Sequence, residues 1–264
     1  MNKLKQNMKS IKFLSAAMAA FLCLGVQAQN VMDVELSNGK VDTYDVSTVK
    51  SVSWREAPIV EEYVDLGLPS KTLWATRNIG AEKPEDFGLY FMWGDTKGYT
   101  SDTGDGMVFD WSTYKYCKGS DTSFTKYCTI SSKGFNSFKD DKTELDLADD
   151  AAYVNLGAEW RMPSQEQYDE LLNGEYTKRE RTTVNNVYGI LITSKKNQKS
   201  IFFPAAGYRN GSDYKSGGSD AGYWSRTLRS DYTYNAWCFF FDSDFMSVLA
   251  SRRNSGLSVR PVRR

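Results

Sequence analysis

The carboxylates of two acidic segments are the side chains whose types and spacing come closest to a known chemistry. Residues 140–150, DDKTELDLADD, hold six carboxylates in eleven positions, and carboxylate oxygens are ligands that Ca²⁺ prefers. Residues 101–112, SDTGDGMVFDWS, contain an Asp-Gly pair. Neither segment has the closing glutamate of a calcium loop. We favour the ordinary alternative for residues 140–150, which is a set of acids stabilised at the start of a helix. The sequence therefore predicts neither a metal site nor a cofactor.

The chain contains no histidine. This excludes serine triads, Cys–His dyads, histidine zinc sites and histidine acid–base catalysis. A carboxylate pair could still cleave glycosides, for example one drawn from Asp242, Asp244 and residues 140–150. Nothing in the sequence specifies such a pair, so we expect a protein that is not an enzyme.

Two cysteines flank a polar insert in the segment YKYCKGSDTSFTKYC. Cys117 and Cys128 each follow a tyrosine, and in an exported protein they are candidates for a disulfide across this loop. The alternative is a pair of reduced thiols. Cys238 has no evident partner.

The first 28 residues have the pattern of a secretory signal peptide. Lysines precede an apolar run at residues 13–26, which ends in Val26-Gln27-Ala28. The run is too short for a membrane span. Cleavage removes four lysines and no acid, so the net charge changes from 0 to −4. We expect an exported chain with no membrane span and no nucleic acid partner.

The mature chain divides at a short linker. Residues 29–54 form a small unit in which residues 31–54 alternate apolar and polar side chains around Asn38-Gly39, the strongest short signal for a β-hairpin. Residues 55–62, around Pro58, indicate a linker. Residues 63–264 read as one continuous domain. The small hairpin unit is expected to dock on that domain or on a partner.

One helix is clearly predicted in the large domain. In residues 160–174, WRMPSQEQYDELLNG, Ser164 and Gln167 form a capping-box pattern. Tyr168 and Leu171 are spaced to face a core. A second helical turn is expected near residue 150, and many short strands surround the helices. This mixture predicts an α+β domain with an antiparallel sheet.

Residues 234–245, YNAWCFFFDSDF, form the strand on which the functional prediction depends. Alternation places Trp237, Phe239 and Phe241 on one side, which is typical of a core face. The other side carries Cys238, Phe240 and Asp242. Because a well-packed core would not combine these residue types, we interpret this side as displayed to solvent or to a ligand. In the alternative, which we weigh equally, Phe240 packs under the hairpin unit or a loop.

Aromatic, arginine and small polar residues surround this strand. Such residues are favoured at recognition surfaces, because each offers large contact area or several donors on few rotatable bonds. The alternative is an ordinary polar loop. The candidate ligand-binding residues are Arg226, Arg229, Asp231, Tyr232, Cys238, Phe240, Asp242, Phe245, Ser247, Ser251, Arg252 and Asn254. The residues expected to frame them from inside are Trp160, Arg161, Pro163, Trp224, Trp237, Phe239, Phe241 and Arg260.

Several segments, taken in order, resemble the Fibrobacter succinogenes major paralogous domain, which is abundant in secreted and surface proteins of Bacteroides-type bacteria. They are YVDLGLPSKTLWATRNIGA, EDFGLYFMWGD, WSTYKYC, LDLADDAAYVNLGAEWRMPS, FFPAAGYRNG, GYWSR and GLSVRPV. WRMPSQEQYDEL is also similar to the helix of formylglycine-generating-enzyme domains. The resemblance covers residues 63–264. It implies a C-type-lectin-like fold with short antiparallel strands and one or two helices, here preceded by the small β-hairpin unit.

The same fold carries the variable proteins of diversity-generating retroelements. Their variable segment often runs from Tyr-Trp-Ser to Ser-Val-Arg-Pro-Val, and residues 223–225 and 258–262 match these ends. The resemblance therefore implies a C-terminal binding surface of the kind that a retroelement diversifies. The calcium and sugar motifs of sugar-binding C-type lectins are absent. Only Cys238 lies where formylglycine-generating enzymes use a cysteine pair.

Together these features predict an exported surface or secreted protein that recognises a protein or glycan ligand without metal or cofactor. One alternative is a structural subunit of a cell-surface assembly, in which residues 31–54 offer a strand edge for pairing. A carboxylate-dependent glycan-active enzyme is the other.

Overall fold

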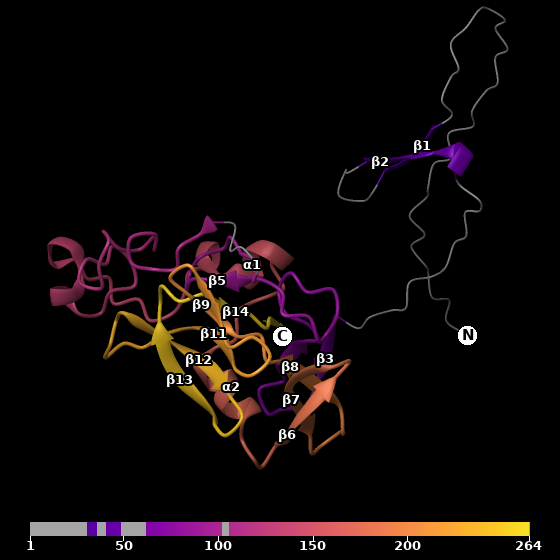
Figure 1. Ribbon diagram of the computed structural model, residues 1–264. Helices are drawn as coiled ribbons and strands as arrows, with labels where there is room; N and C mark the ends of the chain where they lie inside the picture. The colour runs from indigo at the N-terminus through magenta and orange to yellow at the C-terminus, as the bar shows by residue number, and fades with distance from the viewer. Residues whose placement is uncertain (1–30, 36–40, 49–61, 102–105, 264) are drawn as a thin grey trace, which may run out of the picture. The chain divides into compact units, whose positions relative to one another are not determined.

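The computed structural model describes residues 31–35, 41–48, 62–101 and 106–263 (Figure 1). The chain forms two compact units, Met1–Ile59 and Val60–Arg264. The predicted signal peptide, the Asn38-Gly39 turn and residues 55–61 of the predicted linker lie outside the described residues.

The first unit contains a two-stranded antiparallel sheet. Strand β1 (Val31–Glu35) pairs with β2 (Val41–Asp45), and the 3₁₀ turn η1 (Val46–Thr48) follows. The Thr43 hydroxyl donates across the strands to Asp33 at 2.6 Å. Asp45 accepts from the backbone N–H of Ser47 at 2.9 Å. These local bonds set the register of the pair and the start of the turn.

The second unit is rich in β-structure, and the predicted α+β class is wrong. Strands account for 37% of the structure and helices for 12%. The two α-helices, α1 (Ala151–Leu156) and α2 (Gln165–Leu171), have six and seven residues. Helices of about two turns are too short to form a layer over a sheet. The C-type-lectin-like fold implied by the resemblance is thereby overturned in favour of a β-rich fold.

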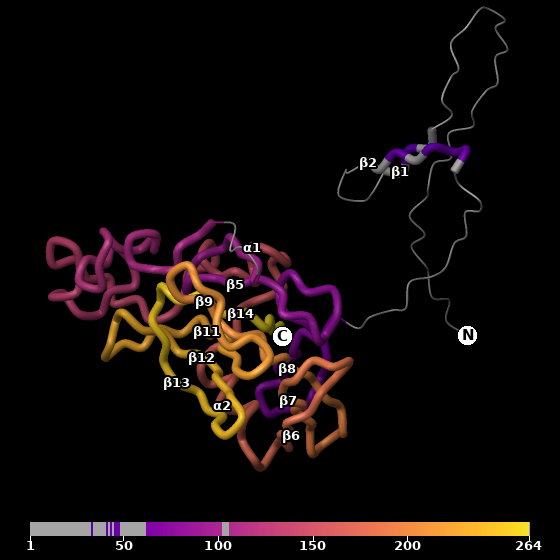
Figure 2. Tube along the Cα trace, in the orientation of Figure 1, coloured from indigo at the N-terminus to yellow at the C-terminus, as the bar shows by residue number. Residues whose placement is uncertain are grey.

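Four sheets make up the described part of this unit. The largest has the strand order β13-β12-β11-β14-β5, in which only β11 and β14 pair in parallel. Figure 2 shows the chain path through β11, β12 and β13, coloured orange to yellow. The strands of this central sheet are β5 (Tyr90–Phe91), β11 (Ala221–Leu228), β12 (Asn235–Phe241), β13 (Met246–Arg252) and β14 (Leu257–Ser258).

The three smaller sheets pack around the central one. One has the order β15-β4-β3 and joins the two ends of the unit, and another has the order β6-β7-β8. The third pairs β9 with β10. Their strands are β3 (Tyr63–Asp65), β4 (Leu73–Ala75), β6 (Thr177–Val184), β7 (Val187–Ser194), β8 (Ser200–Pro204), β9 (Tyr208–Asn210), β10 (Asp213–Lys215) and β15 (Val262–Arg263). The 3₁₀ turns are η3 (Ser131–Lys133), η4 (Phe135–Ser137) and η5 (Leu147–Asp149).

Two hydrophobic clusters lie on opposite faces of the central sheet. Phe239, Phe241 and Tyr223 belong to one cluster, and Cys238 and Trp224 to the other. Successive residues of a strand point to opposite faces, so β11 and β12 contribute side chains to both clusters. A third, mostly aromatic cluster contains Met92, Tyr99, Phe109, Tyr114, Phe124 and Cys128.

Helix α2 begins at the predicted capping box. The Ser164 hydroxyl accepts from the Gln167 N–H at 3.2 Å, and the Gln167 side chain accepts from the Ser164 N–H at 2.8 Å. Tyr168 and Leu171 are fully buried in the first cluster. The helix is thus held at its start by its own residues and along its length by the core.

Arg260 ties the core together from within. It is fully buried, and its guanidinium donates to Asn78 Oδ1 and to the carbonyls of Ala75 and Phe202. The Phe203 ring lies 4.5 Å from the guanidinium carbon. Burial lowers the pKa of Arg260 to about 10, which still leaves it charged at neutral pH.

Three other predicted framing residues lie just before α2. Trp160 and Pro163 are buried. Arg161 is half-buried and donates to the Trp160 carbonyl at 3.0 Å. No helix in the described part of the chain is both long and apolar enough to span a bilayer.

Candidate ligand-binding groove

Strand β12 has a core on each face, so the predicted division into one buried and one displayed face needs correction. Phe239 and Phe241 are fully buried. Cys238 was predicted to be displayed, but it is 1% exposed. Trp237 was predicted to be in the core, but it is half-buried. The Arg229 guanidinium carbon lies 5.4 Å from the Trp237 ring.

The burial of Cys238 follows from its cross-strand neighbours. Trp224 lies opposite it on β11 and Leu249 on β13. Both side chains belong to the second cluster or pack against it. These large neighbours cover nearly all of the Cys238 side chain, and burial raises the pKa of its thiol.

Phe240 lies on the same face but has small neighbours. Its cross-strand partners are Gly222 on β11 and Ser247 on β13, and the ring is half-buried. A side chain at position 222 would meet Leu257, because an added Cβ would lie 2.9 Å from its Cδ2 atom. Leu257 therefore packs directly over Gly222, and Gly222, Leu257 and the Phe240 ring border one open space.

This space is part of a groove of about 500 Å³ along β12 and β13. Its apolar part consists of Cys238, Phe240, Leu249, Leu257, Gly222 and Ala250, with the rings of Tyr208 and Tyr234. Its polar part consists of Asn210, Asn235, Ser251, Arg252 and Ser255. An apolar pocket with a few placed polar groups is the usual form of a small-ligand site.

Strand β9 places two of these residues. Alternation puts Tyr208 and Asn210 on one side and Arg209 on the other, where it is 1% exposed. The Arg209 guanidinium donates to the Ser101 carbonyl at 2.7 Å and to the Ser212 carbonyl at 3.0 Å. The buried arginine therefore anchors one wall of the groove.

The segment after β13 is anchored in the same way by Arg253. This residue is fully buried, and its guanidinium donates to the carbonyls of Tyr127 at 2.9 Å and Thr233 at 2.8 Å. It also donates to the Tyr114 hydroxyl at 2.8 Å, and the Phe124 ring lies 4.4 Å away. A chain fixed at this point also holds Arg252 and Ser255, which line the groove.

Asn254 was predicted to contact ligand, but it is 6% exposed. Its amide nitrogen lies 3.5 Å from the Phe109 carbonyl. The residue therefore belongs to the interior. Its neighbour Ser255 lines the groove instead.

The chain matches the family model of a domain of unknown function (DUF8237) over residues 114–262. The chain belongs to this family. The search of curated proteins and the search of solved structures found no match.

The DUF8237 region contains every residue that lines the groove, since these residues lie between positions 208 and 257. Four of the twelve predicted ligand-binding residues are among them. They are Cys238, Phe240, Ser251 and Arg252.

Two other sets of predicted residues lie elsewhere in the DUF8237 region. Arg226 pairs with Glu144 at 3.1 Å in a separate pocket. Arg229 pairs with Asp231 at 3.1 Å and lies 4.4 Å from the Tyr232 ring. Tyr232 is 45% exposed. These side chains form ion pairs and ring contacts outside the groove and do not line it.

Of the remaining predicted residues, Asp242 and Phe245 lie at the turn between β12 and β13, and Ser247 lies on β13. Asp242 accepts from the backbone N–H groups of Asp244 and Phe245, so it caps the turn. Phe245 is 48% exposed, and its ring centroid lies 6.5 Å from that of Phe240. Ser247 is half-buried and donates to the Val248 carbonyl.

The predicted disulfide between Cys117 and Cys128 is absent, and both residues are free thiols. The Cys117 sulfur donates to the Trp111 carbonyl at 3.0 Å, and the Cys128 sulfur to the Ile130 carbonyl at 3.2 Å. Each thiol thus has its own backbone acceptor. Burial raises the pKa of both thiols, which disfavours the reactive thiolate.

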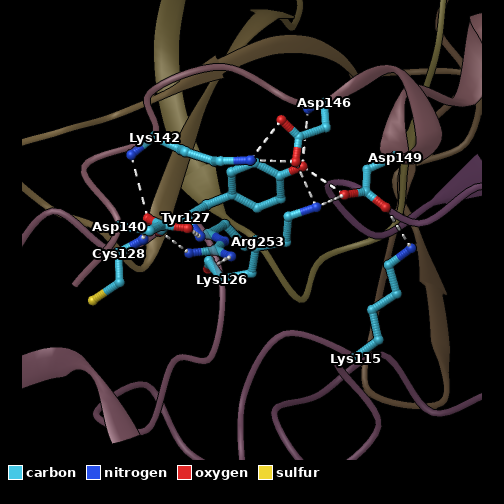
Figure 3. Close-up of polar contacts among 9 residues, drawn as sticks. All are labelled: Lys115, Lys126, Tyr127, Cys128, Asp140, Lys142, Asp146, Asp149 and Arg253. Atoms are coloured by element: carbon cyan, nitrogen blue, oxygen red, sulfur yellow. Dashed lines mark hydrogen bonds and ion pairs between the residues drawn. The ribbon is translucent and has the colours of Figure 1, made fainter. Parts of the chain in front are cut away.

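The acidic run at 140–150 is part of the scaffold (Figure 3). Asp140 accepts from the backbone N–H groups of Tyr127 and Cys128, both at 2.8 Å. Asp146 pairs with Lys126 at 2.7 Å. Asp150 caps helix α1. These contacts give Asp140, Asp146 and Asp150 structural roles.

Asp149 is the centre of this network. Its carboxylate accepts from Lys126 at 2.6 Å, from the Tyr127 hydroxyl at 2.5 Å and from Lys115 at 3.5 Å. Burial alone would raise the pKa of Asp149, but hydrogen bonds from Lys126, Tyr116 and Tyr127 outweigh it and lower the pKa to about 2. The carboxylate is therefore ionised and fully engaged at neutral pH.

Several groove residues were not predicted from the sequence. They are Tyr208, Asn210, Tyr234, Asn235, Leu249, Ser255 and Leu257. The alternation in Tyr208-Arg209-Asn210 was a usable signal, since it places the tyrosine and the asparagine on one side. No local signal could have placed Leu257 beside Gly222, because the two lie on different strands.

The lining of the groove suits non-covalent binding. It includes no carboxylate among the described residues, and its one thiol is buried. Within the described ranges, no three His, Cys, Asp or Glu side chains come close enough to hold a metal ion. Rings, amides, hydroxyls and one guanidinium are the groups available to a ligand.

Proposed function

We propose that this protein binds a glycan in the groove between β9, β12 and β13. The observation that carries the proposal is the half-buried ring of Phe240, which lies in a groove of about 500 Å³ beside amide, hydroxyl and guanidinium groups. A partly exposed ring that keeps space beside it gains burial when a ligand covers it.

The chemistry of a sugar matches both parts of the groove. A pyranose ring has patches of C–H on its faces and hydroxyls around its edge. The rings of Phe240, Tyr208 and Tyr234 can cover the C–H patches. The side chains of Asn235, Ser251 and other polar residues can form hydrogen bonds with the sugar hydroxyls.

Arg252 limits the charge of the ligand. It is exposed, and it is the only charged side chain in the described lining of the groove. A guanidinium repels cations and donates up to five hydrogen bonds. The groove therefore favours a neutral or acidic glycan.

The test is electrophoresis of the native protein through gels that contain a mannan, a xylan or a β-glucan, compared with gels without polysaccharide. We expect at least one polysaccharide to retard the chain. Phe240→Ala and Ser251→Trp should weaken retardation at least tenfold, the first by removing a ring and the second by filling the groove. The matched controls are Phe135→Ala, at a ring that is 44% exposed, and Thr183→Trp, on the exposed side of β6.

Two results would contradict the proposal. One is retardation by no polysaccharide of the panel. The other is retardation that the groove variants and the controls change equally. Capture of a peptide that only the groove variants lose would replace the glycan by a protein ligand.

Export is part of the proposal. The signal-peptide pattern in residues 1–28 and the resemblance to a domain of secreted and surface proteins support it. Mass spectrometry of the chain recovered from the producing cell should show an N-terminus near Gln29. An intact Met1 terminus on all copies would count against export.

A structural role in a surface assembly is the second candidate. It rests on the pair β1–β2, which among the described residues forms a sheet of two strands with no third. Such a pair offers edges to another chain. If the hairpin assembles the protein, deletion of residues 31–54 will convert a multimer into monomers in light scattering. A multimer that survives this deletion would exclude the role.

A further inference from the structure

A second pocket, of about 420 Å³, is lined by three arginines. They come from different parts of the chain, because Arg161 precedes α2, Arg226 lies on β11 and Arg263 on β15. Glu144, Glu159 and Gln167 complete the polar lining. We propose that this pocket binds an oxyanion group of a ligand, namely a phosphate, a sulfate or a carboxylate.

Arg226 is held in place by neutral acceptors. Its Nη1 atom donates to the Met162 carbonyl at 2.9 Å and to Gln167 Oε1 at 3.1 Å. Its Nε atom lies 3.1 Å from Glu144. Gln167 is the capping-box partner of Ser164 at the start of α2, so the guanidinium is positioned by the start of a helix that is itself fixed in the core.

Arg161 and Arg263 are held by aromatic rings. The Arg263 guanidinium carbon lies 4.1 Å from the Tyr63 ring, and that of Arg161 lies 4.5 Å from the Tyr153 ring. Arg161 also donates to the Trp160 carbonyl at 3.0 Å. A guanidinium stacked on a ring keeps its N–H edge free to meet an anion in its plane.

One donor group in this pocket remains without an acceptor. The Nε atom of Arg263 is buried and has no hydrogen-bond partner among the described residues. A buried donor without a partner costs free energy, and an anion that reaches it recovers that cost. The pocket therefore has a physical reason to take up an acceptor.

The two glutamates do not cancel the three arginines. With three positive and two negative side chains the pocket has a net charge of +1. The Glu159 side chain is 74% exposed and that of Glu144 49%, whereas Arg263 and Arg226 are 22% and 23% exposed. Exposed ion pairs contribute little stability. A ligand anion can therefore replace Glu159 at Arg263 at low cost.

Fixed guanidiniums recognise oxyanions with paired hydrogen bonds. Because these three are already oriented, little side-chain entropy is lost on binding. The pocket is larger than a bare ion requires, and Ala158 and Val262 add an apolar wall. The geometry suits an anionic substituent together with part of the molecule that carries it. No lining residue is shared with the groove.

Isothermal titration at constant ionic strength tests the proposal, with inorganic phosphate, sulfate and glucuronate as probes and chloride as the reference. We expect saturable binding of at least one probe, and the preferred probe distinguishes a tetrahedral anion from a carboxylate. Arg263→Gln and Arg161→Gln should weaken binding at least tenfold. Glu159→Gln should strengthen it severalfold, since it removes the competing carboxylate.

Arg181→Gln is the matched control, because Arg181 is an exposed arginine on β6 and lines neither pocket. Phe240→Ala should leave anion binding unchanged, which separates this proposal from that of the groove. Circular dichroism melting of each variant shows whether it is folded. The proposal is overturned if no probe binds saturably, or if folded Arg263→Gln and Arg161→Gln bind as tightly as Arg181→Gln does.

Discussion

Asp149 shows how a single carboxylate can stabilise an irregular region of this protein. Residues 106–150 contain short turns and isolated bridges but no strand or α-helix, so side-chain contacts add to the few backbone hydrogen bonds that hold them. Asp149 accepts from two lysines and a tyrosine. Its folded-state pKa of about 2 lies below its ordinary value of 3.8. A lowered pKa means that the ionised form stabilises the fold.

This stabilisation should disappear in acid. It is fully present above pH values near 4 and is lost as the pH falls through about 2, because the unfolded state takes up the proton first. A shift of this size corresponds to about 2 kcal/mol at most. We expect Asp149→Asn to lower the free energy of unfolding at pH 7 by about this amount and to flatten its pH dependence between about pH 4 and 2.

Urea denaturation at a series of pH values measures both effects. Asp141→Asn is the control, because Asp141 is exposed and pairs only with exposed Lys139. An Asp149→Asn variant with the acid sensitivity of the parent would contradict the role given to Asp149.

Phe239 and Phe240 are neighbours on one strand with opposite surroundings. Phe239 is fully buried in the first cluster, whereas Phe240 is half-buried beside the groove. Phe239→Ala should lower the free energy of unfolding by about 3–5 kcal/mol, and Phe240→Ala by only about 1–2 kcal/mol. Chemical denaturation of both variants measures the difference. Equal losses would mean that the groove is closed around Phe240 in solution.

At the scale of elements, features that depend on nearby residues could be predicted from the sequence, and features that depend on distant residues could not. The capping box of α2 and the alternation in β12 involve residues a few positions apart, and both could be predicted. The parallel pairing of β11 with β14 and the pairing of β14 with β5 join residues far apart in the chain. No local pattern specifies such pairs, so the strand order of the central sheet could not be predicted.

The capping box allows a test at this scale. Ser164→Ala removes the acceptor for the Gln167 N–H and should lower the free energy of unfolding by about 1 kcal/mol. Ser164→Thr keeps a hydroxyl and should lose less. Thermal melting compares the two. If alanine and threonine are equivalent, tertiary packing and not the cap holds the start of α2.

At the scale of the whole molecule, the second unit contains both pockets and all three hydrophobic clusters. It should therefore fold and bind by itself. We expect a chain of residues 60–264 to melt within a few degrees of the full chain. It should also be retarded by the same polysaccharides as the full chain. Calorimetry and gel retardation measure these properties.

A chain that begins at Thr72 is the matched control. It lacks β3, whose Val64 pairs with Trp74, and it lacks Leu66 and Leu68 of the first cluster. It should not fold. Loss of folding already in the chain of residues 60–264 would show that the first unit supports the second.

The sequence by itself determined the features that depend on neighbours along the chain. These are the helix cap at Ser164, the inward rings of Phe239 and Phe241, and the exclusion of histidine chemistry. Tertiary structure alone decided that Cys238 is almost fully covered while Phe240 is half-buried. The two residues have the same strand, the same face and similar hydrophobicity. They differ in what lies opposite, Trp224 and Leu249 in one case and Gly222 and Ser247 in the other, and whether a side chain is covered depends on the bulk of those distant neighbours.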